Sequence, residues 1–408
     1  MVDPCPGIGD VRSRLVRLIP DSDSPETTSL RQLFNHRLPK KYDAARAEWS
    51  SIVEGTHALW DDMSSPKREL IRSFLNGFNL EALKRSRPSS RFDYSGASVG
   101  NLFLTGARLY TGSFEAAIHL FSSICGVSGD VSVLPALNTN FASHIAAGLA
   151  NGDVITGQND ISHPNVPTAA VPGPTAAPWD SAGGETEEHD TVEDANLPGS
   201  LPALRKPAIT FSKVDEEELK ARIERVWYIN PYGQEIRIPA NPRVVDALRE
   251  CGSVIYSVGS LFTSLIPNLV LRGVGEVIAT NAAIRNKILI LNGSLDRETG
   301  PSSNPFSALD FVAAIANACS YSRGKPPPAE EEYSLYVTHV VYLEGKASPA
   351  VDREKLSMLG IDTLRLYGPS QGTEGGRYDA KGLMQALEAV VGRKDVRLDR
   401  SRRNTLVG

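Results

Sequence analysis

The chain has 408 residues, of which 41% are hydrophobic, so it can bury one large core or two ordinary ones. Its formal net charge is -5 and it has no long Lys/Arg cluster, which argues against nucleic acid as a main partner. Its apolar runs stop well short of the roughly 18 residues that span a bilayer, and no charged-then-apolar leader opens it. We expect a globular cytoplasmic protein that binds neither nucleic acid nor membrane.

A glycine-rich turn at residues 6–10 precedes a stretch, residues 11–19, in which apolar side chains recur at helical spacing. Asp10 can cap this helix. A glycine-rich turn at a helix start can bind an anion, and three arginines lie close to it: Arg12, Arg14 and Arg17. A solvated basic face is the alternative interpretation.

Residues 27–86 show a mostly helical pattern, which we assign to packing. Small residues at 95–101 then precede a long apolar helical stretch, which indicates a second helix start that faces a ligand. Glycines before a helix are also common turn residues, so an ordinary turn is the alternative.

The middle of the chain contains strand-like segments on both sides of a segment without apolar periodicity. Residues 131–137 are a strand candidate, and Asn151-Gly152 predicts a hairpin within residues 144–161. From about 162 to 206, Pro, Ala, Gly, Thr and acidic residues replace the apolar periodicity, which predicts a disordered acidic, Pro-rich insertion. Its acidic cluster is more typical of a solvated loop than of a metal site. A strand is expected again near Ile209.

Helices and strands alternate through the rest of the chain. Strands are expected at 254–256, 287–292, 337–344 and 363–367, and helices at 240–251, 273–279, 307–319, 353–359 and 379–391, before a frayed tail at 400–408. Such alternation predicts an α/β fold, Rossmann-like, with a mostly parallel three-layer sheet and the disordered insertion. We expect residues 1–408 to form a single domain.

The strand at 254–256 ends in a loop rich in small and hydroxyl-bearing residues, Gly259, Ser260, Thr263 and Ser264. Ligands bind at the carboxyl ends of strands in open α/β sheets, where such residues let backbone N–H groups approach a phosphate. An ordinary turn whose hydroxyls cap a helix is the alternative. The strand at 287–292 also ends in a polar loop, residues 292–300. If the two strands are parallel, both loops face one crevice.

Several segments together resemble one family, the CofD-like proteins, which include 2-phospho-L-lactate transferases and the gluconeogenesis factors often called YvcK. PGIGDVRSRL resembles the family's PPGDLRNCL, GASVGNLFL its GHSLGNLLL, and VLPAL its VLPAT. SVGSLFTSLIPNLVL is similar to GPGSLYTSIIPNLLV, and LNGSLDRETG takes the place of a family Asn…Glu-Thr segment. Order and spacing agree over most of residues 6–320, and YINPYGQEI and LPGSLPALRKP resemble the eukaryotic branch.

The resemblance implies a nucleotide diphosphate or nucleotide-sugar ligand at the carboxyl edge of a Rossmann-like sheet. It also implies magnesium, and transfer of a phospho-linked group from a nucleotide carrier. A homodimer is among the states that it allows. The residues that it places around the nucleotide and its phosphates are Gly9, Asp10, Arg12, Gly100, Asn101, Gly259, Ser260, Thr263, Ser264 and Asn292.

The family pattern also contains a GGTG-type strand-loop and an Asp-Asp-Gly-Gly-Ser-Ser-like segment before the motif that begins here at Pro6. Neither is found in this sequence, so the resemblance supplies no catalytic residue and no metal ligand. The sequence is then either an incomplete gene model, which we favour, or an isoform with an altered site. Three hypotheses remain: a CofD-type transferase, a non-catalytic nucleotide-sugar-binding regulator of carbon metabolism, and an inactive truncated form.

Overall fold

A computed structural model describes residues 8–21, 24–86, 92–137, 139, 143–162, 201, 204, 218–345, 347–368 and 376–392. The expected strand near Ile209, the frayed tail and all of the expected insertion except residues 162, 201 and 204 lie outside these ranges. The described residues form two compact units, with the boundary in the sequence between Ser143 and His144. The single domain stays a prediction.

The first unit is helical in the part that the structure describes. It contains α1 (Ile8–Arg17), α2 (Pro25–Asn35), α3 (Tyr42–Glu54), η1 (Ala58–Trp60), α4 (Ser65–Arg85), α5 (Val99–Thr111) and α6 (Phe114–Cys125). Apolar residues at helical spacing bury one face of each helix in a common core. Phe34 lies at its centre, with its ring centroid 5.1 Å from that of Phe103 and 4.4 Å from that of Phe121. The helical pattern expected for residues 27–86 is confirmed.

Two local expectations in this unit are wrong. Residues 131–137 form no strand, because Pro135 has no N–H to donate and no described segment pairs with them. Val131 is 46% exposed, so its apolar side chain faces solvent rather than a sheet core. Asp10 does not occupy the capping position, because α1 already begins at Ile8. It lies in the first helical turn, where a negative charge is still favourable.

A parallel sheet organises the second unit. It contains β5 (Ser253–Tyr256), β6 (Asn286–Ile290), β7 (His339–Leu343) and β8 (Asp362–Leu366), in that spatial order. All three neighbouring pairs are parallel, with Ile255 opposite Ile288 and Leu289 opposite Val340. This confirms the α/β class and the parallel arrangement of the strands at 254–256 and 287–292. The carboxyl ends of β5 and β6 therefore share one edge.

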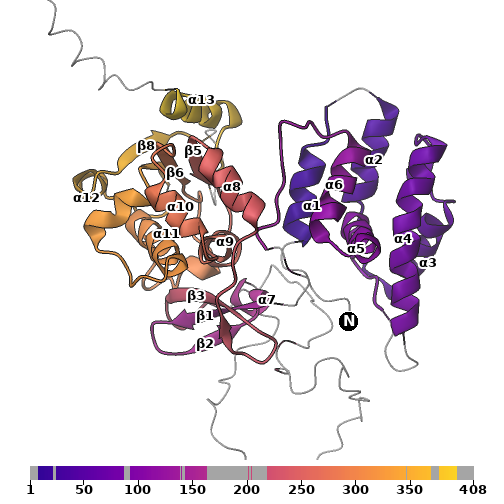
Figure 1. Ribbon diagram of the computed structural model, residues 1–408, viewed down its shortest axis with the longest axis horizontal. Coiled ribbons are helices and arrows are strands. Elements are labelled where there is room, and N and C mark those ends of the chain that lie inside the picture. Colours follow the sequence, from indigo (N-terminus) through magenta and orange to yellow (C-terminus); the bar gives the residue numbers. More distant parts are fainter. Residues whose placement is uncertain are drawn as a thin grey trace, which may run out of the picture. The chain divides into compact units, whose positions relative to one another are not determined.

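Helices cover both faces of this sheet. The connections between strands contain α10 (Val274–Thr280), α11 (Ala308–Ser322) and α12 (Arg353–Met358), and right-handed crossovers between sequential parallel strands put them on one face. Helix α13 (Ala380–Val391) covers the other, where Val390 packs with Ile288 and Val341. Figure 1 shows α13 and α11 on opposite sides of the strands. The three layers follow from this arrangement.

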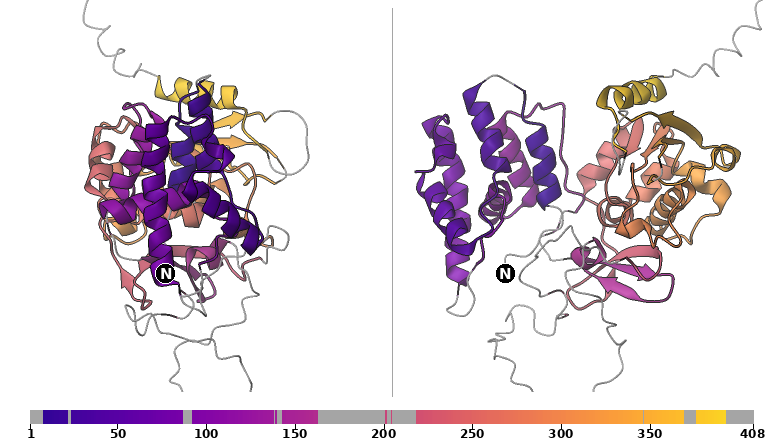
Figure 2. Two further views of the ribbon diagram at one scale, coloured as in Figure 1. Left: turned by 90° about the vertical axis from the view of Figure 1, so that its right-hand side faces the viewer. Right: turned by 180° about the vertical axis from the view of Figure 1, so that it is seen from behind.

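A second, antiparallel sheet lies against α11. It contains β1 (His144–Leu149), β2 (Val154–Thr156), β3 (Ile223–Ile229) and β4 (Glu235–Ile236), in the order β2-β1-β3-β4. The hairpin predicted at Asn151-Gly152 joins β1 to β2, and Gly152 has the positive φ of 91° that such a turn needs. Trp227 and Ile229 of this sheet are buried, and Tyr321 of α11 packs against them. Within this unit, the β1–β2 hairpin and α13 lie at opposite ends (Figure 2).

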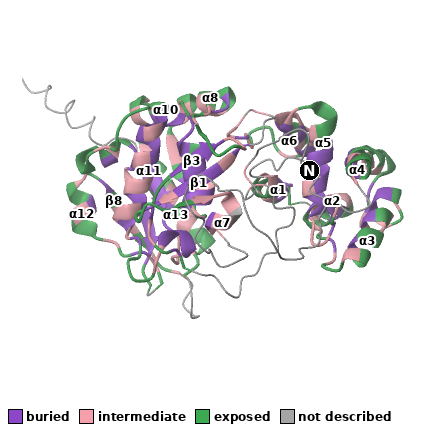
Figure 3. Ribbon diagram, turned by 90° about the horizontal axis from the view of Figure 1, so that it is seen from below, coloured by how far each residue is buried: buried purple, intermediate pink, exposed green. Residues whose placement is uncertain are grey.

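Three shorter helices complete the second unit: α7 (Gln158–Ser162), α8 (Pro242–Glu250) and α9 (Ile266–Leu269). Asn241 starts α8 by accepting a hydrogen bond from the N–H of Arg243 at 3.1 Å, which is a standard N-cap. No residue of α8 is buried, whereas β1 and β3 are largely buried (Figure 3). Helix α8 therefore lies at the surface, and β5 follows it in the chain.

Gly106 allows α5 to lie unusually close to α4. A Cβ at Gly106 would lie 2.0 Å from the carbonyl oxygen of Phe74, whereas one at Gly77, in α4, would meet nothing within 4 Å. Gly106→Ala should therefore lower the free energy of unfolding by about 1–3 kcal/mol through overpacking. Gly77→Ala should raise it by up to about 1 kcal/mol, because alanine favours a helix.

Urea unfolding of both variants and the parent protein, followed by circular dichroism, measures the difference. Equal effects of the two substitutions would show that the α4–α5 contact tolerates an extra methyl group.

Candidate functional site

The loops that follow β5 and β6 are hydrogen-bonded to each other. The N–H of Gly259 donates to Asn292 Oδ1 at 3.1 Å, and Asn292 Nδ2 donates to the carbonyl oxygen of Gly259 at 2.9 Å. One side-chain amide therefore fixes the orientation of the peptides on both sides of Gly259. The expectation that these two loops meet is confirmed by this geometry, and their role in binding a ligand stays a prediction.

A buried carboxyl group ties the next turn to the same loop. Ser260 precedes η3 (Leu261–Leu265), a π-helical turn that continues into α9. Glu298, in the short helix η4 (Arg297–Thr299), accepts hydrogen bonds from the N–H groups of Phe262 and Thr263 at 2.8 and 3.0 Å. It also accepts the Thr263 hydroxyl at 2.5 Å, and only 2% of Glu298 is exposed. These three donors are therefore satisfied inside the protein.

The donors that remain for a ligand lie on the outer side of the loop. The hydroxyl of Ser260 does not cap the turn, and neither it nor the hydroxyl of Ser264 is hydrogen-bonded to any residue that the structure describes. Gly259 is exposed, and a Cβ there would point toward Ser264 at 3.7 Å. Gly259, Ser260 and Ser264 thus form one accessible surface. Thr263 lies behind it, and its predicted contact with phosphate stays a prediction.

The pKa of Glu298 reflects its surroundings. Burial raises this pKa to about 7, hydrogen bonds from Thr263 and Phe262 lower it in part, and the nearby Asp296 adds to the rise. Sequence reasoning did not identify Glu298 as a site residue. Its partners are more than 30 positions away in the chain, and no local pattern marks such a contact.

Glu298 should make stability depend on pH. Its folded pKa, about 7, lies above the ordinary 4.5, so the folded state binds the proton more tightly than the unfolded state. The stabilisation is fully present below pH 4.5 and is lost as pH rises through about 7, by about 3 kcal/mol in all. Glu298→Gln should flatten this decline, because the amide keeps the shape and does not titrate.

Urea unfolding of the parent and the variant at pH 4.5, 6 and 8 tests the change in slope. Glu224→Gln is the control, because Glu224 is exposed on β3 and its replacement should leave the pH dependence unchanged. If Glu298→Gln and the parent lose stability equally between pH 4.5 and 8, the carboxyl does not titrate in this range.

The other predicted site residues lie in the helical unit. Arg12 is buried, and its Nη1 donates to Asn35 Oδ1 at 3.0 Å. A Cβ at Gly100 would lie 2.5 Å from the carbonyl oxygen of Phe34 and 2.8 Å from Cδ of Arg12. Gly100 therefore allows α5 to pack against Arg12 and the end of α2. A packing role explains this glycine fully, and its predicted ligand contact stays a prediction.

Gly9, Asp10 and Asn101 lie near this contact. Gly9 and Asp10 are exposed on the first turn of α1, and a Cβ at Gly9 would lie 3.9 Å from Nδ2 of Asn101. The Oδ1 atom of Asn101 is buried and accepts no hydrogen bond from the described residues. The ten predicted site residues thus form two groups, one in each compact unit.

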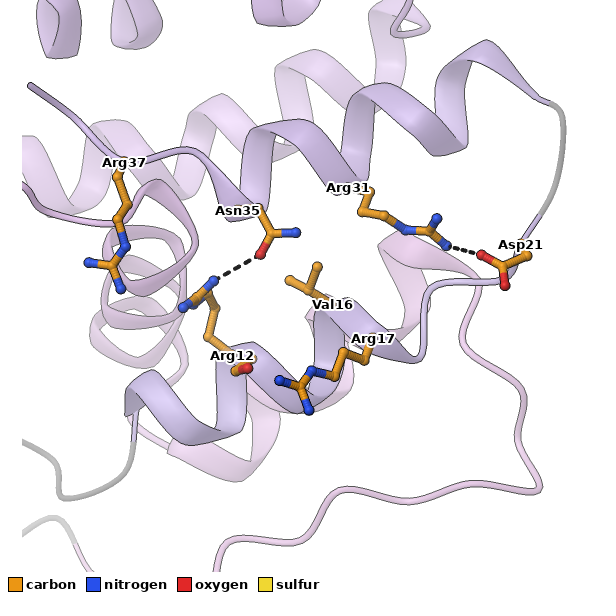
Figure 4. A pocket seen from close by; sticks show the side chains of 8 residues that line it. Arg12, Val16, Arg17, Asp21, Arg31, Asn35 and Arg37 are labelled. Atoms are coloured by element: carbon orange, nitrogen blue, oxygen red, sulfur yellow. Dashed lines mark hydrogen bonds and ion pairs between the residues drawn. The ribbon is translucent and has the colours of Figure 1, made fainter. Parts of the chain in front are cut away.

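The helical unit also contains a cavity of about 590 Å³ between α1 and α2. Four arginines line it, together with Asn35, Asp21, Ser13 and Val16, and Figure 4 shows Arg12 pointing to Asn35 and Arg31 pointing to Asp21. The arginines are Arg12, Arg17, Arg31 and Arg37. Sequence reasoning singled out the first two, whereas Arg31 and Arg37 join them only because α2 folds back along α1.

The predicted magnesium has no preformed cluster of metal ligands among the described residues. Among them, no group of three or more His, Cys, Asp or Glu side chains could hold a metal ion. Mg²⁺ is usually bound by one or two carboxylates together with substrate phosphates. The accessible donors beside β5 are hydroxyls, which do not by themselves define a metal site. Magnesium and the nucleotide stay predictions.

No helix among the residues that the structure describes is both long enough and apolar enough to cross a bilayer. The fold and the loops after β5 and β6 define a Rossmann-like α/β protein with a polar surface at the carboxyl edge of its parallel sheet. Residues 4–365 match the family described as 2-phospho-L-lactate transferase CofD. The chain belongs to this family.

Individual relatives agree with this assignment. The protein YNL011C of Saccharomyces cerevisiae is 38% identical over 360 residues, which cover 83% of this chain and 79% of the relative. The gluconeogenesis factor of Halalkalibacterium halodurans is 24% identical, over 76% of this chain and 74% of the relative. A solved UPF0052-family structure from Bacillus halodurans superposes with a TM-score of 0.52 at 20% identity, covering 92% of this chain and 82% of that one. The last likeness shows the fold alone.

Proposed function

We propose that the chain is a nucleotide-diphosphate-dependent transferase of the CofD type, which moves a phospho-linked group from a nucleotide carrier to an acceptor. The observation that supports this proposal best is the pair of loops joined by Asn292. Together they leave Gly259, Ser260 and Ser264 accessible at the carboxyl edge of β5. Ligands of open α/β sheets bind at this edge.

Each loop residue has a distinct part in binding the diphosphate. Gly259 lets a phosphate approach the backbone, because it has no side chain in the way. The hydroxyls of Ser260 and Ser264 donate hydrogen bonds to phosphate oxygens. Asn292 and Glu298 are positioning residues, since they hold the peptides of Gly259 and of the η3 turn. Transfer of phospho-linked groups depends mainly on such positioning.

The second candidate is a non-catalytic regulator that binds a nucleotide sugar. The specific observation in its favour is the set of relatives named gluconeogenesis factors, one 24% identical from Halalkalibacterium halodurans and one 23% identical from Bacillus subtilis. Both candidates use the same loops for the diphosphate. They differ in whether the bound nucleotide is turned over.

Asn292→Ala should weaken binding of GDP or a UDP-sugar roughly tenfold, because two hydrogen bonds that fix Gly259 are lost. Gly259→Val should weaken it more, by placing a branched side chain where the phosphate approaches. Isothermal titration calorimetry on the folded variants measures both effects. Asn286→Ala is the matched control, because Asn286 lies at the opposite end of β6 and its replacement should leave affinity unchanged. Unchanged affinity in all three variants would reject the loops as the nucleotide site.

Turnover separates the two candidates. The chain should release the nucleotide from a nucleotide-linked phosphoester when Mg²⁺ and an alcohol acceptor are present, and Gly259→Val should abolish that release. Liquid chromatography of the reaction mixture follows the free nucleotide. Tight binding of the same compound without any release would favour the regulator instead.

A further inference from the structure

The cavity between α1 and α2 concentrates positive charge in the helical unit. Four guanidinium groups line it, and the one acidic side chain in its lining, Asp21, pairs with Arg31 at 2.8 Å. The other three lining arginines form no ion pair with a described residue. Arg37 donates one hydrogen bond, to the carbonyl oxygen of Gly96 at 3.3 Å. The described residues of the lining thus carry an excess of three positive charges.

Arg12 is the most constrained of the four arginines. It is 9% exposed, its Nη1 donates to Asn35, and its Nε is buried without a hydrogen-bond partner among the described residues. Burial lowers the pKa of Arg12, and repulsion from Arg37 lowers it further. A buried cation with an unsatisfied donor is costly unless a negative charge compensates it.

The lining also restricts the kind of anion that fits. Among the described residues that line the cavity, Val16 is the one apolar side chain. A nucleobase usually binds against apolar or aromatic side chains, so these walls do not suit one. Planar guanidinium groups instead match the paired oxygens of phosphates and carboxylates. Several of them around one cavity favour a compact ligand with more than one negative charge.

We propose that this cavity, here called the arginine pocket, binds a compact phosphate-bearing anion with at least two negative charges. All the described residues that line the site belong to the helical unit. Buried Arg12 donates to Asn35 in the lining, while Arg17, at the end of α1, and Arg37, in the segment that follows α2, are exposed (Figure 4). The proposal does not depend on the proposed function.

Inorganic pyrophosphate is a suitable probe, because it is compact and carries several charges. Its binding to the full chain is measured by isothermal titration calorimetry with EDTA present, so that no metal complex competes. Arg17→Ala should weaken binding roughly fivefold or more, since it removes a charge-assisted hydrogen bond. Arg14→Ala is the matched control: Arg14 lies on the same helix, is exposed and does not line the pocket.

Pyrophosphate binding is compared among variants of the arginine pocket, of the nearby surface and of the loop beside β5. The pocket is supported if Arg17→Ala weakens pyrophosphate binding while Arg14→Ala and Asn292→Ala do not. It is rejected if both arginine variants lose affinity equally, since that result reflects the net charge of the surface. It is also rejected if Asn292→Ala alone weakens binding, because the anion then binds beside β5. Absence of pyrophosphate binding to the parent chain rejects it outright.

Discussion

The carboxyl group of Glu298 determines how the chain leaves β5. It accepts two N–H groups and one hydroxyl from Phe262 and Thr263, so the start of the η3 turn is fastened to the segment that follows β6. Without this acceptor, those buried donors would be unpaired, and each would cost about 1–3 kcal/mol. Asn292 makes a second tie at Gly259. Asn292 and Glu298, which follow β6, therefore fix the conformation of the loop that follows β5.

This internal carboxyl also decides what the loop can offer a ligand. The start of a helical turn attracts anions, and here Glu298 already takes that place for two of the N–H groups. In the proposed site, a phosphate would meet the outer surface of Gly259, Ser260 and Ser264. Because the pKa of Glu298 is about 7, a phosphate bound close by would favour its neutral form through like-charge repulsion. Binding of a more negatively charged ligand would therefore raise the pKa of Glu298.

The sequence was informative where a structure depends on near neighbours in the chain. The hairpin at Asn151-Gly152, a helix within 240–251 and the individual strands at 254–256 and 287–292 all formed as expected. Residues 131–137 show the limit, because a strand also needs a partner that local pattern does not reveal. Glu298 and Gly100 show the same limit for sites. Which atoms approach a buried carboxyl or a glycine is settled by distant segments.

The two proposed anion-binding surfaces depend on different physical principles. The loop beside β5 offers neutral hydroxyls, whose contribution depends on orientation and is little affected by salt. The arginine pocket offers full charges, two of them on the exposed residues Arg17 and Arg37, and exposed charges are screened as ionic strength rises. The loop can therefore discriminate by the shape of a phosphate, and the pocket by its number of charges.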